Sequence, residues 1–192
     1  MRLRNRRMNF RTALPRRLAG VCLAAALAIA AAMSGGSAVA KTIKVFALGA
    51  SNTNGKGVGY DEAWPAQLER MLRAKGYDAT VKVNALNGDT SAGILGRASS
   101  IPEGTQVVVF DTGGDNDRLR GTSQAETAAN RGRIESAIRA HHAVPIWAPY
   151  KTIIGPQRSG GSGYQADGIH LTAQSHARMA AYLVPKVIAA AK

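Results

Sequence analysis

Short apolar runs alternate with segments of helical period along most of this 192-residue chain, and this alternation limits the folds that it can adopt. Four runs have the length and the β-branched or aromatic content of buried strands, at residues 43–48, 80–83, 106–110 and 143–148. Strands that are joined through helices cannot pair as hairpins, so they form a parallel sheet with helices on both faces. The sequence therefore predicts an α/β fold built on a parallel sheet.

Helices are predicted between these strands and near the C-terminus. One helix has Pro65 near its start and Gly76 after its end, with apolar side chains three or four positions apart at Trp64, Leu68, Met71 and Leu72. A capping box at residues 123–126 opens a second helix. Thr172 is the expected N-cap of a last helix, which Pro185 is expected to kink.

The first part of the chain, residues 1–40, is expected to be a signal peptide. Seven arginines precede an alanine-rich apolar run at residues 18–33, and small residues follow up to Ala38-Val39-Ala40. This order gives a basic region, a hydrophobic region and a cleavage site. The apolar run has 16 residues, fewer than the ~20 that span a bilayer, which favours cleavage over a retained anchor. We therefore expect an exported domain at residues 41–192, periplasmic or secreted, with no membrane span; arginine pairs leave twin-arginine export open.

Removing this segment changes the argument from charge. The whole chain has a formal net charge of +13, but residues 41–192 carry 18 lysines and arginines against 12 acidic residues, a net charge of +6. These charges are scattered without a basic run, so no nucleic-acid partner is expected. The single cysteine is Cys22, so the exported domain has no disulfide or thiolate site. No metal site is expected, because the adjacent His141 and His142 would lie on different faces of a helix.

Polar segments follow the expected strands at the points where the strands end. Ser51 follows the first strand, residues 84–90 follow the second, and residues 111–117 follow the third, while Asp167 and His170 precede the last helix. In an open parallel sheet, the site lies beyond the carboxyl ends of the strands, near a topological switch point. The four polar segments are therefore expected to meet at one edge of the sheet.

These segments contain the groups that acyl transfer from a serine requires. Ser51 needs a base, which His170 would supply, and His170 needs a carboxylate to orient it, which Asp167 would supply. The oxyanion needs fixed donors, and the backbone N–H groups of Ser51 and Gly88 with the side-chain amide of Asn116 would provide three. Each motif taken alone is also explained as a turn or a packed side chain. All four in order on one edge favour the catalytic interpretation.

The order and spacing of these residues resemble the GDSL/SGNH hydrolase family. The four blocks of that family carry Ser, Gly, Asn and an Asp-x-x-His pair, which match Ser51, Gly88, Asn116, Asp167 and His170. The likeness is closest to the periplasmic acyl-CoA thioesterase/lysophospholipase branch, through residues 64–66, 88–91 and 119–121. The resemblance implies a flavodoxin-like three-layer α/β/α fold with a mostly parallel sheet. It also implies hydrolysis of small-molecule acyl esters or thioesters without metal or cofactor.

The chain departs from the family pattern around the serine and before the Asp-His pair. Ala50 replaces the aspartate that usually precedes the serine, and Asn52 replaces the leucine that usually follows it. Asp167 follows Asn116 by only 51 positions, and a Gly/Ser-rich stretch at residues 155–163 stands where the family usually has a further helix and strand. These departures concern how the nucleophile and the base are held, since the residues that the chemistry requires are present.

Three functions remain open from the sequence. A thioesterase or lysophospholipase needs a long apolar groove, whereas a carbohydrate O-acetylesterase needs a small pocket beside a polar surface. A non-catalytic binding protein on a decayed hydrolase fold is the third. The sequence does not choose among substrates or give the oligomeric state.

Overall fold

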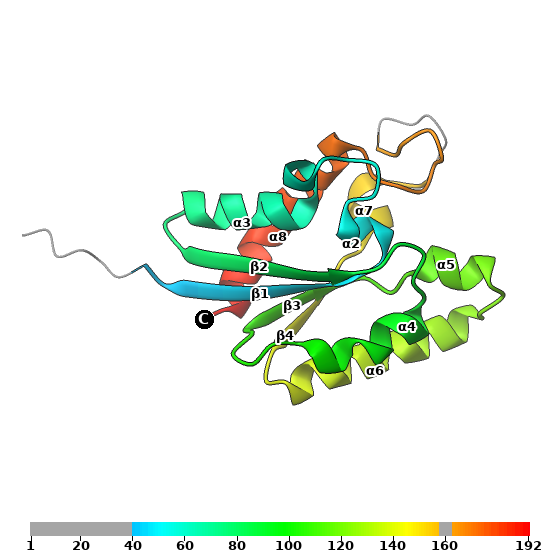
Figure 1. Cartoon of the computed structure of the whole chain (residues 1–192), viewed down its shortest axis with the longest axis horizontal. Helices are drawn as coiled ribbons and strands as arrows, with labels where there is room; N and C mark the ends of the chain where they lie inside the picture. Colours follow the sequence, from blue (N-terminus) through cyan, green and yellow to red (C-terminus); the bar gives the residue numbers. More distant parts are fainter. Residues whose placement is uncertain (1–39, 158–162) are drawn as a thin grey trace, which may run out of the picture. The chain divides into compact units, whose positions relative to one another are not determined.

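One four-stranded sheet forms the centre of the domain (Figure 1). The structure is a computed structural model that describes residues 40–157 and 163–192. The predicted signal peptide lies outside these residues except for Ala40, so the domain boundary stays a prediction. In the described part of the chain, no helix is long and apolar enough to cross a membrane.

The strands run parallel in the order β2-β1-β3-β4. Their bounds are β1 Thr42–Gly49, β2 Asp78–Ala85, β3 Val107–Phe110 and β4 Val144–Trp147. All four strand predictions are confirmed to within two residues at each end. The chain leaves β1 toward one side for β2 and returns to the other side for β3, which places a topological switch point beside the carboxyl end of β1. The predicted parallel α/β fold is confirmed.

Helices cover both faces of the sheet. Alternate side chains of β1 point to opposite sides, and apolar side chains on both sides are buried under helices. Ile43, Val45 and Ala47 pack in a core with α3 (Trp64–Ala74) and α8 (Ala173–Ala190). Phe46 and Leu48 pack in a second core with α4 (Ser91–Gly96) and α6 (Gln124–Ala140). Figure 1 shows α3 and α8 on one side of the strands and α4 and α6 on the other. Burying each large apolar side chain stabilises the fold by about 1.5–3 kcal/mol.

The long helices begin where the sequence signals predict. Pro65 occupies the first turn of α3, and Gly76 has a left-handed φ of 85° just after that helix. The side chain of Ser123 accepts the N–H of Glu126 at the start of α6, and that of Thr172 accepts the N–H of Ser175 at the start of α8. Pro185 lies inside α8.

Short helices connect these elements near the carboxyl ends of the strands. Besides α4 they are α2 (Ser51–Asn54), η1 (Tyr60–Glu62), η2 (Ala98–Ser100), α5 (Gly114–Leu119) and α7 (Tyr150–Ile154). Between β4 and the Asp-His pair, the described residues form only α7 and a loop. In the part of the chain that the structure describes, β4 is thus an edge strand, and no fifth strand covers it.

Candidate active site

Ser51 lies at the first position of α2, immediately after β1, and only 7% of it is exposed. The N–H groups of Thr53 and Asn54 donate to the carbonyl of Ala50, which turns the chain sharply away from the strand. The left-handed Gly55, with a φ of 77°, ends this one-turn helix. The serine is therefore fixed at the carboxyl edge of the sheet.

The structure brings Ser51, His170 and Asp167 into one hydrogen-bonded chain. His170 Nε2 lies 3.0 Å from Ser51 Oγ, and His170 Nδ1 lies 2.5 Å from Asp167 Oδ2. An ionised carboxylate only accepts, so Nδ1 donates to Asp167 and Nε2 is left to accept the serine proton. The 3.0 Å distance lies within the range for direct proton transfer.

Asp167 is ionised in this arrangement. Partial burial would raise the pKa of Asp167, but donors outweigh it: the imidazole of His170 and the backbone N–H groups of His170 and Ile169, at 3.0 and 2.9 Å. Together they lower the pKa of Asp167 to about 2. The carboxylate therefore keeps its charge at every pH at which a neutral imidazole can act as a base.

Ser51 faces a cavity of about 240 Å³. Three segments and three further side chains form its walls: residues 50–52, 111–116 and 147–152, with Gln157, Tyr164 and Ile169. One wall is charged and polar, because Lys151 Nζ and Gln157 Nε2 both bind the carboxylate of Asp115, at 2.9 and 2.8 Å. The cavity therefore combines the buried Ser51 hydroxyl with a wall that carries both apolar and polar groups.

Two of the predicted oxyanion donors, Ser51 and Asn116, line this cavity. Asn116 Nδ2 donates one N–H to the carbonyl of Asp89, at 2.7 Å, and an amide nitrogen has a second N–H. Gly88 adopts a left-handed φ of 77° but is not among the residues that line the cavity. The structure thus groups Asn116 with Ser51 at the cavity, and Gly88 is outside the lining.

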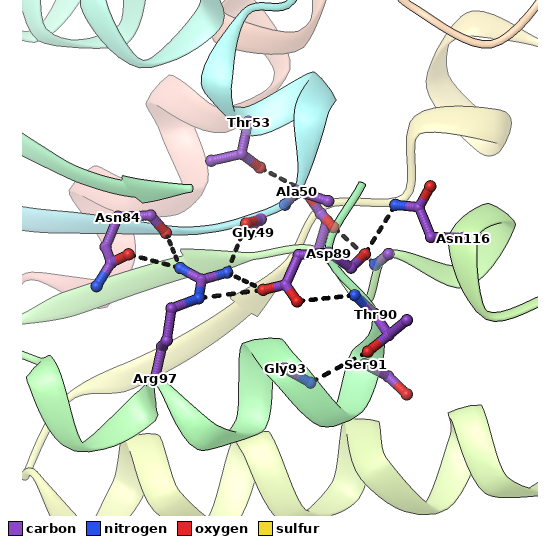
Figure 2. A network of polar contacts seen from close by, with 12 residues as sticks. Gly49, Ala50, Thr53, Asn84, Asp89, Thr90, Ser91, Gly93, Arg97 and Asn116 are labelled. Carbon is purple, nitrogen blue, oxygen red and sulfur yellow. Dashed lines mark hydrogen bonds and ion pairs between the residues drawn. The ribbon is translucent and has the colours of Figure 1, made fainter. Parts of the chain in front are cut away.

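Arg97, at the C-terminal end of α4, joins the segments that carry these donors (Figure 2). Its guanidinium donates to the carbonyl of Gly49 at 2.9 Å, to the carbonyl and side chain of Asn84 at 2.7 and 2.6 Å, and to Asp89 Oδ2 at 2.5 Å. It thereby ties the ends of β1 and β2 to the residue whose carbonyl orients Asn116. Sequence reasoning missed Arg97, because an arginine in a helical segment has no distinguishing pattern.

Asp111, directly after β3, is a second carboxylate beside the nucleophile turn. It is 5% exposed and accepts the N–H of Ala50 at 3.0 Å, the hydroxyl of Thr53 at 2.5 Å and the N–H of Gly113 at 2.8 Å. Burial raises the pKa of Asp111, although these donors oppose the shift. The family usually has an aspartate at the position of Ala50. In this chain a carboxylate at the same turn comes instead from Asp111, the residue after β3. A Cβ added at Gly49 would overlap the Asp111 carboxylate, which explains glycine there.

Metal coordination has no support in the described residues, where no group of three or more His, Cys, Asp or Glu side chains lies close enough to hold an ion.

A Ser-His-carboxylate chain at the carboxyl edge of a parallel α/β sheet is an arrangement found in α/β serine hydrolases. A model of the GDSL-like Lipase/Acylhydrolase family matches residues 47–183, and the chain belongs to this family. The family predicted from the sequence is thus confirmed.

Individual relatives agree with this family. Esterase TesA of Pseudomonas aeruginosa is 35% identical over 108 residues, which are 55% of this chain and 52% of the relative. The match thus spans about half the length of that curated relative. A crystal structure of a protein named TesA superposes with a TM-score of 0.65 and 25% identity, covering 75% of this chain and 97% of that protein. A carbohydrate acetylesterase family member from Sinorhizobium meliloti shares the fold, with a TM-score of 0.59, 18% identity, and coverage of 78% and 99%.

Proposed function

We propose that the protein hydrolyses carboxylic esters or thioesters with Ser51 as the nucleophile, His170 as the base and Asp167 as the group that orients the base. The observation that carries the proposal is the chain of contacts from Ser51 to His170 at 3.0 Å and from His170 to Asp167 at 2.5 Å, at the wall of a cavity. These contacts argue against a decayed, non-catalytic fold, because a binding protein has no need of this arrangement.

The proposed reaction has two steps. In the first, His170 takes the proton of Ser51 as the hydroxyl attacks the acyl carbon, and then gives that proton to the leaving alcohol or thiol. In the second, His170 takes a proton from water as the water attacks the acyl carbon, and then gives that proton to Ser51 Oγ as the acyl–Oγ bond breaks and the acid leaves. The N–H of Ser51 and the amide of Asn116 stabilise the oxyanion in both steps, and we propose Gly88 as the third donor.

Similarity to an esterase named TesA supports ester hydrolysis. The first candidate within that class is a thioesterase or lysophospholipase, which rests on the sequence resemblance at residues 64–66, 88–91 and 119–121. The cavity supports the second candidate, a carbohydrate O-acetylesterase. Its volume of about 240 Å³ is below the ~300–1,000 Å³ typical of pockets for larger ligands, and Asp115 and Gln157 contribute polar groups to its wall. A short acyl group esterified to a polar alcohol suits these dimensions better than a long acyl chain.

The test is hydrolysis of p-nitrophenyl esters from acetyl to palmitoyl, together with an acetylated sugar and a long-chain acyl-CoA. We expect Ser51→Ala to lose all of this activity and Ser51 to react with a fluorophosphonate. Ser136→Ala, which changes an exposed serine on α6, is the matched control and should act like the wild type. Undiminished turnover by Ser51→Ala, or labelling of another serine, would refute the proposed nucleophile. Faster turnover of palmitoyl than of acetyl esters would reject the acetylesterase candidate.

We also propose that the chain is exported and that residues 1–40 are removed. The support is the order of the basic, apolar and small residues in that segment. Mass spectrometry of the protein from the periplasm or the medium should find Lys41 as the first residue. A protein that keeps residues 1–40 in the cell would contradict the proposal.

A further inference from the structure

Asn52, the residue after the nucleophile, binds the backbone on both sides of His170. Its Nδ2 donates to the carbonyl of Ile169 at 3.3 Å, and its Oδ1 accepts the N–H of Leu171 at 3.0 Å. A carboxamide has one donor and one acceptor side by side, which is what this pair of backbone groups requires. One side chain from α2 therefore spans the residue that carries the base.

The contacts of Asp167 do not perform this task. Its carboxylate binds the N–H groups of Ile169 and His170 and the ring of His170, all within the same turn. These bonds shape the turn and orient the imidazole, but they do not connect the turn to Ser51. Asp167 is also 44% exposed, so packing around it contributes little to the position of the turn.

Gln165 provides a second connection between the same two segments. Its Nε2 donates to the carbonyl of Leu171 and to that of Lys56, both at 2.8 Å, and its backbone N–H donates to the carbonyl of His170 at 2.7 Å. Lys56 follows α2, so the side-chain contacts of Asn52 and Gln165 both join the Asp-His turn to the segment that begins with Ser51. Asn52 is the nearer of the two to the reacting atoms, since it is the neighbour of Ser51.

We propose that Asn52 is the positioning residue that sets the distance between the His170 imidazole and the Ser51 hydroxyl. This inference rests on the proposed serine-hydrolase function. Ser51 and Asn52 belong to one turn of α2. This short helix therefore carries the nucleophile and also binds the backbone of the residues on either side of the base. Asn52 thereby holds a turn that has no neighbouring strand in the described residues beyond the single bridge between Tyr164 and Leu171.

The test compares Asn52→Leu and Asn52→Asp with Asn54→Leu in the full chain. Asn54 lies on the same helix, is exposed, and binds Asn87 at 3.0 Å rather than the Asp-His turn, so it is the matched control. We expect Asn52→Leu to lower kcat for p-nitrophenyl acetate by about 10- to 100-fold, with KM within about twofold, because small misplacements of reacting groups cost this much. Asn52→Asp loses the donor to the Ile169 carbonyl but keeps the acceptor for the Leu171 N–H, whereas Asn52→Leu loses both. The fall of kcat in Asn52→Asp should therefore be no larger than that in Asn52→Leu.

A second arm separates positioning from general stabilisation. In a His170→Ala background there is no base to position, so adding Asn52→Leu should cause no further loss of residual activity. Equal fold-losses with and without His170, a raised KM at constant kcat, or an Asn52→Leu variant as active as Asn54→Leu would each overturn the proposal.

A third arm does not depend on turnover. Hydrogen exchange of the amides at residues 168–172 should be faster in Asn52→Leu than in the wild type and unchanged in Asn54→Leu. If the wild type hydrolyses no ester, the proposed function fails, and this exchange measurement still decides whether Asn52 holds the turn. Unchanged exchange in Asn52→Leu would show that it does not.

Discussion

Asn116 donates one N–H of its amide to the carbonyl of Asp89 and lines the cavity that Ser51 faces, and its amide nitrogen has a second N–H. A donor that is already oriented costs no reorganisation when charge develops on the oxyanion. We expect Asn116→Ala to lower kcat by roughly 10²–10³-fold and to change KM little, which is the range for removing one such donor. Steady-state kinetics with a short ester measures both constants. The opposite pattern, a raised KM at constant kcat, would make Asn116 a substrate-binding residue.

Asp167 and His170 together predict the response of the reaction to acid. The pKa of Asp167 is lowered to about 2, so this carboxylate does not titrate between pH 8 and pH 5. The charge of Asp167 should therefore not contribute to any change of kcat/KM over that range. We expect Asp167→Asn to lower kcat by roughly 10²–10⁴-fold, because an amide favours the wrong imidazole tautomer.

The measurement is a pH–rate profile of the wild type and of Asp167→Asn. A circular dichroism spectrum of the variant serves as the control for folding. An Asp167→Asn variant with the kcat of the wild type would mean that the Asp-His pair is not the base system.

Some site residues were accessible to sequence reasoning and others were not. Ser51 and the Asp167–His170 pair stand at ends of predicted elements in a fixed order, and the structure brings them together. Asp111 and Arg97 act through contacts with segments about 50 or 60 positions away along the chain. Such contacts exist only in the folded protein, so nothing in the local sequence distinguishes these two from other charged residues.

At the scale of elements, length decides what the sequence predicts. The strands and the helices α3, α6 and α8 repeat an apolar pattern over several turns or residues, so they were predicted. The helices α2, α5 and α7 have six residues or fewer, which is too short for a period to be visible. These short helices carry Ser51, Asn116 and much of the cavity wall, so the site was harder to predict than the sheet beneath it.

Asp111 connects three such elements, because its carboxylate accepts donors from the α2 turn, from the loop before α5 and, at 3.4 Å, from Tyr150 on α7. In Asp111→Asn, one backbone N–H, of Ala50 or of Gly113, must face the new NH₂ group. We expect the free energy of unfolding to fall by about 1–3 kcal/mol, the cost of a buried donor without an acceptor.

Urea denaturation of Asp111→Asn measures this loss. Tyr150→Phe removes the 3.4 Å contact with Asp111 and also the oxygen that contacts Thr53 and accepts the indole N–H of Trp64, so it measures the loss of that whole hydroxyl network. Equal stability of Asp111→Asn and the wild type would show that the carboxylate does not join these elements.

At the scale of the whole molecule, the parallel sheet follows from local patterns but the strand order and the substrate do not. The walls of the cavity come from residues 50–52, 111–116 and 147–152 and from the loop before α8, and their side chains meet only after folding. The basic character of the full sequence is also misleading, because much of it belongs to residues 1–40. The size and polarity of the cavity are therefore properties of the assembled domain.

His176 makes the stability of the whole domain depend on pH. It is fully buried on α8, its Nδ1 accepts the N–H of Trp64 at 3.2 Å, and its Nε2 has no hydrogen-bond partner among the described residues. Burial lowers the pKa of His176 from 6.5 to about 4, although the charge of Glu62 opposes the shift. His176 therefore takes up a proton near pH 6.5 in the unfolded chain but only near pH 4 in the folded domain.

The free energy of unfolding should accordingly fall by about 3 kcal/mol as the pH decreases from 6.5 to 4, since each pKa unit is worth about 1.4 kcal/mol. His176→Asn keeps an acceptor for the Trp64 N–H and cannot titrate, so its stability should change much less over this range. His141→Asn, at the exposed end of α6, is the control and should keep the wild-type dependence. Urea denaturation at a series of pH values measures all three proteins. The same slope in His176→Asn and in the wild type would show that the buried imidazole does not control acid stability.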